Sequence, residues 1–79
     1  MAKTIFTEQH RKFIYALRDL RREKGVTQMQ LSERLGRVQS YISNIERGER
    51  RLDVIEFAEI AHALGEEPSK LYARILPDY

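Results

Sequence analysis

The chain has 79 residues, of which 42% are hydrophobic and 33% charged, with 14 lysines and arginines against 12 aspartates and glutamates. This length suffices for one small domain, residues 1–79, and the composition argues against a disordered or fibrous chain. No apolar run approaches the ~20 residues that span a bilayer. Because there is no cysteine, disulfides and thiolate metal sites are excluded. We expect a cytoplasmic protein that does not bind a membrane.

The charge is distributed unevenly along the chain. Residues 1–51 carry 12 basic and 6 acidic side chains, whereas residues 52–79 carry 2 basic and 6 acidic ones. Such asymmetry is typical of a protein of which one part meets a polyanion. Ordinary surface charge on helices explains it equally well, so the charge alone does not decide the function.

The first two predicted helices have clear start and stop signals. A short arm, residues 1–6, precedes a helix over residues 8–24, with Thr7 as its N-cap and Gly25 as its stop. A capping box of Thr27 and Gln30 opens a second helix of about two turns, which ends at Gly36. The inward positions of these helices are Phe13, Ile14, Leu17, Leu20, Leu31 and Leu35.

The third predicted helix, residues 38–46, is rich in small polar side chains, and Gly48 ends it. A helical wheel of about 100° per residue separates two faces. The face predicted to be buried carries Val38, Ile42, Ile45 and Glu46. The opposite stripe carries Ser40, Asn44 and Arg47, flanked by Arg37, Gln39, Tyr41 and Ser43.

Two further helices complete the predicted fold. A capping box of Asp53 and Glu56 opens the fourth, and Glu67 and Pro68 are the predicted N-cap and first residue of the fifth. A tail, residues 77–79, follows. Their inward positions are Val54, Phe57, Ile60, Ala61, Leu64, Leu71 and Ile75. No alternating strand pattern competes, so we predict an all-α fold, a compact bundle of five short helices.

Enzymatic and metal-binding chemistry finds little support in the sequence. His10 and His62 lie far apart without the spacing of metal ligands, and we expect both to face solvent. Ser40 and Ser43 lack a plausible histidine–aspartate relay. We therefore expect neither an enzyme nor a protein with a cofactor, a metal or a small-molecule ligand.

The outer stripe of the third predicted helix has the composition of a surface that reads DNA. Glutamine and asparagine amides can pair with adenine, and serine hydroxyls can donate or accept at base edges. Arginines at both ends of the stripe would reach phosphates and fix the register. A plain polar surface helix is the alternative, although such a helix usually carries more glutamate and lysine.

Two adjacent segments resemble the helix-turn-helix of the phage Cro/repressor (XRE-like) family. They are Gln28-Met29-Gln30-Leu31-Ser32-Glu33-Arg34-Leu35-Gly36 and Gln39-Ser40-Tyr41-Ile42-Ser43-Asn44-Ile45-Glu46-Arg47-Gly48. The match is specific because a small residue at the helix crossing, a glycine in the turn and two inward isoleucines coincide. The resemblance extends from about Leu17 to Gly65. It implies a lambda-repressor-like domain and a sequence-specific transcriptional regulator that binds double-stranded DNA in the major groove.

The resemblance also implies roles for individual residues. Base-reading positions are Gln39, Ser40 and Asn44, with Tyr41 and Ser43 at their edges. Phosphate contacts are implied for the backbone amides at Gln28 and for Arg47, Arg50 and Arg51. Arg21 and Glu46 match a structural ion pair that braces the first helix against the third.

Two positions depart from the family pattern. Arg37 stands where many members have an apolar residue, and we expect it to reach a phosphate. Val38 stands where members have serine, threonine or proline, so the third helix lacks its usual side-chain cap. The missing cap is expected to lower the stability of the helix by ~1 kcal/mol. Its start is therefore expected to lie a residue away from the predicted one.

The size of the chain favours a homodimer, because a domain this small seldom draws more than ~3–5 kcal/mol from its core. The expected interface uses the fourth and fifth helices and the tail, with Ile55, Tyr72, Ile75, Leu76 and Tyr79. The expected operator is a palindrome with half-sites ~10 bp apart or a multiple of that. Two alternatives stay open: a protein-interaction adaptor or antitoxin that uses the same fold as a scaffold, and a less favoured RNA-binding protein.

Overall fold

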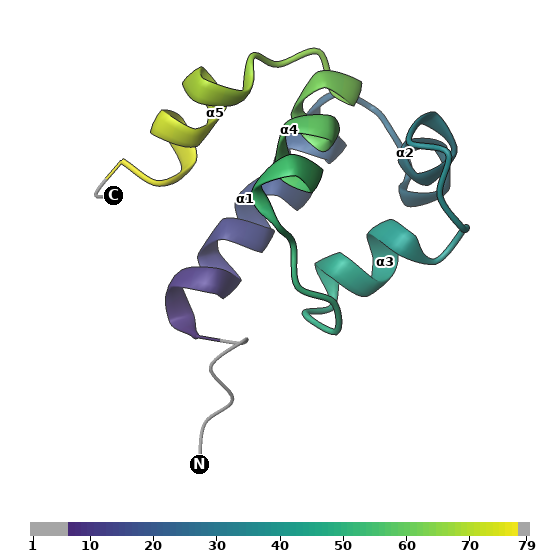
Figure 1. Cartoon of the computed structure of the whole chain (residues 1–79), viewed down its shortest axis with the longest axis horizontal. Helices are drawn as coiled ribbons and strands as arrows, with labels where there is room; N and C mark the ends of the chain where they lie inside the picture. Colours follow the sequence, from purple (N-terminus) through teal and green to yellow (C-terminus); the bar gives the residue numbers. More distant parts are fainter. Residues whose placement is uncertain (1–6, 78–79) are drawn as a thin grey trace.

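A computed structural model describes residues 7–77 of the chain (Figure 1). This part contains five helices and no strand, as predicted. The helices are α1 (Glu8–Glu23), α2 (Gln28–Arg34), α3 (Tyr41–Glu46), α4 (Val54–Ala63) and α5 (Pro68–Ile75). The predicted N-terminal arm and Tyr79 of the predicted tail lie outside the described residues. Among residues 7–77, no helix combines the length and the apolar composition needed to cross a membrane.

Four of the five helices begin at the side-chain cap that the sequence predicts. In each of them, an oxygen of the N-cap side chain accepts a hydrogen bond from the backbone amide three positions further on. The N-caps are Thr7, Thr27, Asp53 and Glu67. At Thr27 and Asp53 the reciprocal hydrogen bond completes the predicted capping box. Local hydrogen bonds therefore set these four helix starts.

The third helix is shorter than predicted, since it begins at Tyr41 instead of Val38. Ser40 occupies the N-cap position, but its side chain makes no capping hydrogen bond. The cap comes from α2, because the amide of Ile42 donates to the hydroxyl oxygen of the fully buried Ser32 at 3.2 Å. Val38 is 73% exposed, so its predicted burial is wrong. It lies in the turn before α3, where the helical wheel does not apply.

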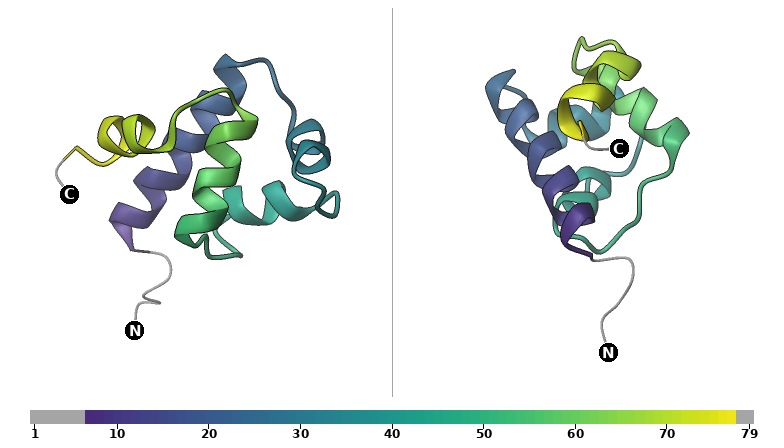
Figure 2. Two further views of the ribbon diagram at one scale, coloured as in Figure 1. Left: turned by 45° about the horizontal axis from the view of Figure 1, so that its top comes forward. Right: turned by 90° about the vertical axis from the view of Figure 1, so that its left-hand side faces the viewer.

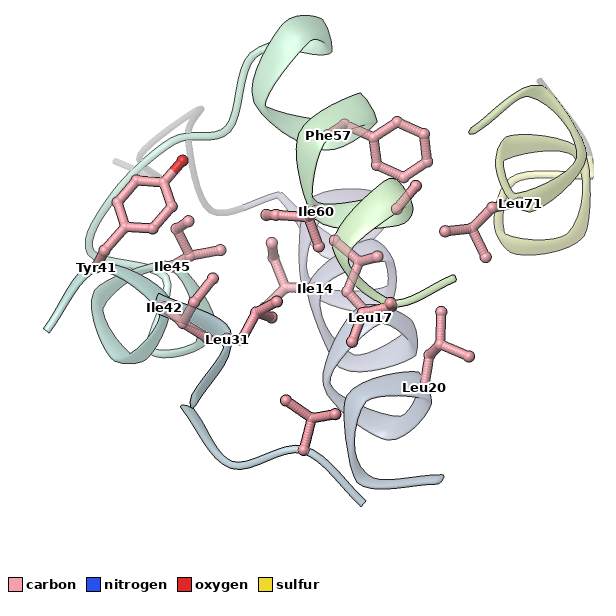
Figure 3. Close-up of a cluster of buried hydrophobic side chains, with 13 residues drawn as sticks. Ile14, Leu17, Leu20, Leu31, Tyr41, Ile42, Ile45, Phe57, Ile60 and Leu71 are labelled. Atoms are coloured by element: carbon pink, nitrogen blue, oxygen red, sulfur yellow. The ribbon is translucent and has the colours of Figure 1, made fainter. Parts of the chain in front are cut away.

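One cluster of buried apolar side chains joins all five helices (Figure 3). Its members are Ile14, Leu17, Leu20, Val26, Leu31, Tyr41, Ile42, Ile45, Phe57, Ile60, Ala61, Leu64 and Leu71. Phe13, Leu35 and Ile75 pack against it, partly buried. The predicted burial of Val54 is wrong, since this side chain is 75% exposed. On α4, the first side chain that enters the core is Phe57, one turn further on.

The arrangement of the helices leaves one side of α3 outside the core. α2 and α3 lie together on one side of α1 and α4, whereas α5 lies on the other side (Figures 1 and 2). Ile42 and Ile45 turn the inner side of α3 toward the core (Figure 3). The polar side chains between them consequently point outward.

Candidate nucleic-acid interface

A buried ion pair holds α3 against the first two helices. Nε and Nη2 of Arg21 donate to the two carboxylate oxygens of Glu46 at 2.7 and 3.0 Å. Nη1 of Arg21 donates to the backbone oxygen of Val26 at 2.8 Å, and the side-chain amide of Gln28 donates to Glu46 at 2.8 Å. The ion pair expected from the resemblance is therefore present, and it connects the end of α3 to α1 and to the start of α2.

The outer side of α3 and the turn before it form an open polar surface. We define the reading surface as Gln39, Ser40, Ser43 and Asn44. The first two are exposed and the last two half-buried. Three of them border a shallow depression of about 450 Å³, together with Gln28 and Met29 at the start of α2. A flat partner can therefore approach α2 and α3 at the same time.

The polar groups of the reading surface are only partly occupied by other groups of the protein. The Ser43 hydroxyl donates to the backbone oxygen of Ser40 at 3.0 Å. Oδ1 of Asn44 accepts from Arg47 at 2.6 Å. Within residues 7–77, the Asn44 amide nitrogen and the Gln39 side chain make no hydrogen bond. These amides can donate to a ligand, and Oδ1 of Asn44 has a second lone pair for a ligand's donor.

Tyr41 does not belong to the reading surface, contrary to prediction. Its side chain is 5% exposed, and the guanidinium carbons of Arg37 and Arg50 lie 4.6 and 5.0 Å from the centroid of its ring. Burial, followed by the negative charge of Glu56, raises the pKa of Tyr41. A ring covered in this way cannot meet the edge of a base, so the base-reading role predicted for Tyr41 is wrong.

Two of the arginines predicted to bind phosphates contact acidic side chains of α4. Arg37 lies 3.5 Å from Glu59, and Arg50 forms an ion pair with Glu56. Both also stack on the ring of Tyr41. Their contacts connect the turn before α3 and the loop after it to α4. In this arrangement, the two arginines stabilise the position of α3 relative to α4.

The other predicted phosphate contacts are open to a ligand. Arg51 is exposed and forms no ion pair within the part of the chain described here. Arg47 is exposed, and its contact with Glu49 at 3.2 Å is a surface ion pair of the weak kind. The backbone amide of Gln28 makes no hydrogen bond to any described residue, although the side chain of Gln28 is bound to Glu46.

The two histidines differ in environment. His62 is exposed, as predicted, whereas His10 is half-buried near the start of α1. Both ring nitrogens of His10 are inaccessible and have no hydrogen-bond partner among residues 7–77. Burial, and secondarily the positive charge of Arg51, lowers the pKa of His10. The expectation that both histidines face solvent is therefore wrong for His10.

The free energy of unfolding is expected to fall when the pH drops below the ordinary histidine pKa. The pKa of His10 is lowered in the folded chain, whereas in the unfolded chain His10 takes up its proton near the ordinary pKa of ~6.5. The contribution of neutral His10 is therefore complete above about pH 6.5 and is lost as the pH falls through the lowered folded-state pKa. Thermal denaturation at about pH 7.5 and about pH 5.5 measures the effect. His10→Gln should reduce the difference between the two melting temperatures, whereas His62→Gln should leave it unchanged.

Two short helices, a glycine-containing turn and an exposed polar side on the second helix define a helix-turn-helix protein. Residues 17–71 match the family model described as helix-turn-helix. The chain belongs to the XRE-type helix-turn-helix family. This confirms the resemblance found in the sequence. The family is one of DNA-binding transcription regulators and not a family of enzymes.

Three similar proteins illustrate this membership. A segment of 46 residues, 58% of the chain, is 52% identical to the uncharacterized HTH-type transcriptional regulator y4dJ of Sinorhizobium fredii and spans 60% of that protein's length. An XRE-family like protein from Pseudomonas syringae superposes with a TM-score of 0.82, at 37% identity over 89% of this chain and 85% of that chain. The clp gene regulator ClgR from Corynebacterium glutamicum superposes with a TM-score of 0.75, at 28% identity over 91% and 77% of the two chains.

Proposed function

We propose that this chain is a sequence-specific transcriptional regulator that reads double-stranded DNA in the major groove with α3. The proposal rests on one observation. The reading surface, on α3 and the turn before it, presents amides and hydroxyls together, while contacts with the other helices hold α3 in place. Asn44 and Gln39 can each pair with an adenine, and Ser40 can bond to several base edges. The major groove, about 12 Å wide, admits a helix that lies on the surface of its domain.

Contacts to the DNA backbone would fix the register of the reading surface. The amide of Gln28, at the start of α2, and the guanidinium groups of Arg47 and Arg51, after α3, are open at the two ends of this surface. Amides at helix starts and arginines both bind phosphates well. The polar reading groups thus lie between two sets of groups that can bind phosphates. This order matches a DNA duplex, in which the groove lies between two phosphate chains.

Substitutions on the reading surface should change base preference. We expect Gln39→Ala and Asn44→Ala each to reduce discrimination at one base pair by ~1–3 kcal/mol. Arg51→Ala should weaken binding on all sequences and lower the salt slope by about one. Lys70→Ala, an exposed cation on α5, is the matched charge control and should change neither property. The measurement is selection from random DNA, followed by titrations at several salt concentrations.

One outcome of these titrations would favour a different function. If the Gln39 and Asn44 variants bind DNA like the parent chain while an interaction with a protein is lost, the fold serves as a protein-interaction scaffold. The proposal requires the opposite result, namely retained folding together with a loss of base preference.

We further propose a homodimer on a two-fold symmetric operator. Support comes from uncovered apolar side chains outside the core, with Ile55 65% and Tyr72 42% exposed. Ile75 and Leu76, at the end of α5, are half-buried and can join them. The DNA selection should return a palindrome with half-sites ~10 bp apart or a multiple of that. A one-sided consensus, together with a monomer mass in sedimentation equilibrium at micromolar concentration, would contradict the dimer.

A further inference from the structure

The first helix begins well before the segment that matches the helix-turn-helix family model. The family match starts at Leu17, whereas α1 starts at Glu8, about two and a half turns earlier. These added turns carry adjacent cations, Arg11 and Lys12, which the sequence pattern did not single out. The helix-turn-helix motif therefore does not account for what this part of α1 does.

The added turns face the loop that follows α3, as the right-hand view of Figure 2 shows. Between them lies an open hollow of about 280 Å³. His10, Arg11 and Tyr15 line it from α1, and Arg47 and Glu49 line it from the loop. Arg47 also contacts Asn44 of the reading surface, so the hollow continues the surface that carries the reading residues.

Two arginines and two glutamates line this hollow, and both carboxylates are already paired with arginines. Glu46 also borders it, but its carboxylate is already bound by Arg21. Glu49 contacts Arg47 in an exposed pair. Arg11 is exposed and forms no ion pair with any of residues 7–77. The guanidinium of Arg11 is thus available to an anion from outside.

We propose that this hollow binds a phosphodiester group of the DNA backbone, held between Arg11 of α1 and Arg47 of the loop. The inference rests on the proposed DNA-binding function. A strand that passes Arg47 at the end of α3 also passes the mouth of the hollow. Guanidinium groups suit this ligand because their fork of donors matches two phosphate oxygens. The added turns of α1 thereby extend the backbone contact beyond the helix-turn-helix motif.

The salt dependence of binding tests the site. On the operator obtained by selection, Arg11→Gln should lower the slope of log K against log salt by about 0.9 for each protomer bound. Lys12→Gln is the matched control. It removes one exposed positive charge from the next position of the same helix, and Lys12 does not line the hollow. The proposal predicts an unchanged slope for this control. Equal changes in both variants, or no change in Arg11→Gln, would overturn it.

Neutral phosphates give a second and more local readout. Methylphosphonate groups, introduced one at a time along the operator, replace charged phosphates with neutral ones. At one of these positions the replacement should weaken binding of the parent chain but leave the binding of Arg11→Gln unchanged. Lys12→Gln should keep the full pattern of the parent chain. If Arg11→Gln also keeps it, the phosphate site is refuted while DNA binding stands. If the parent chain binds no DNA, the proposed function itself fails. Circular dichroism confirms that the variants fold.

Discussion

Replacing Glu46 with alanine is expected to lower the free energy of unfolding by about 3–5 kcal/mol. Its carboxylate accepts two hydrogen bonds from Arg21 and one from Gln28. The side chains of Arg21 and Glu46 are 9% and 8% exposed, so the substitution would leave a buried guanidinium without its acid partner. Chemical denaturation followed by circular dichroism measures the loss.

Two comparisons separate this effect from a general loss of charge. Glu49→Ala removes one partner of an exposed ion pair with Arg47 and should change stability by less than about 1 kcal/mol. The double variant Arg21→Met/Glu46→Leu should recover part of the loss, because it leaves no unpaired buried charge. An equal effect of Glu46→Ala and Glu49→Ala would show that the buried pair does not brace α3.

Replacing Leu71 with alanine is expected to lower the free energy of unfolding by about 2–5 kcal/mol. Leu71 is the only side chain of α5 within the buried cluster, and its exposed fraction is 0% (Figure 3). The substitution removes its apolar contacts and leaves a cavity where α5 meets the core. The measurement is denaturant unfolding, with the slope of the transition compared as well as its midpoint.

The neighbouring residue provides the control for Leu71. Lys70 is exposed, so Lys70→Ala should change stability by no more than about 0.5 kcal/mol. A small effect of Leu71→Ala would mean that α5 unfolds independently of the other helices. The expected large effect, in a single transition, would support the prediction that the chain is one domain.

Much of the candidate site could be predicted from the sequence because it depends on periodicity and on the family resemblance. The inward positions of Ile42 and Ile45 agree with the helical wheel, whereas Gln39 and Ser40 are exposed because they lie in the turn before α3. The wheel was wrong for Val38, because residues in a turn do not follow the helical period. It also could not show that two arginines cover the ring of Tyr41, since Arg50 lies in a loop after α3.

The sequence by itself determined the order of the helices, four of their N-caps and the identity of the helix-turn-helix segment. A cap joins residues three positions apart, and glycine stops act on their own helix, so these signals are complete within a few residues. Only the tertiary structure decided where α3 begins, because its cap is Ser32 of another helix. The packing of α1 against the loop after α3 likewise decided the hollow beside Arg11, and the half-burial of His10 was visible only in the structure. Such contacts depend on how distant segments pack, and no local pattern encodes that packing.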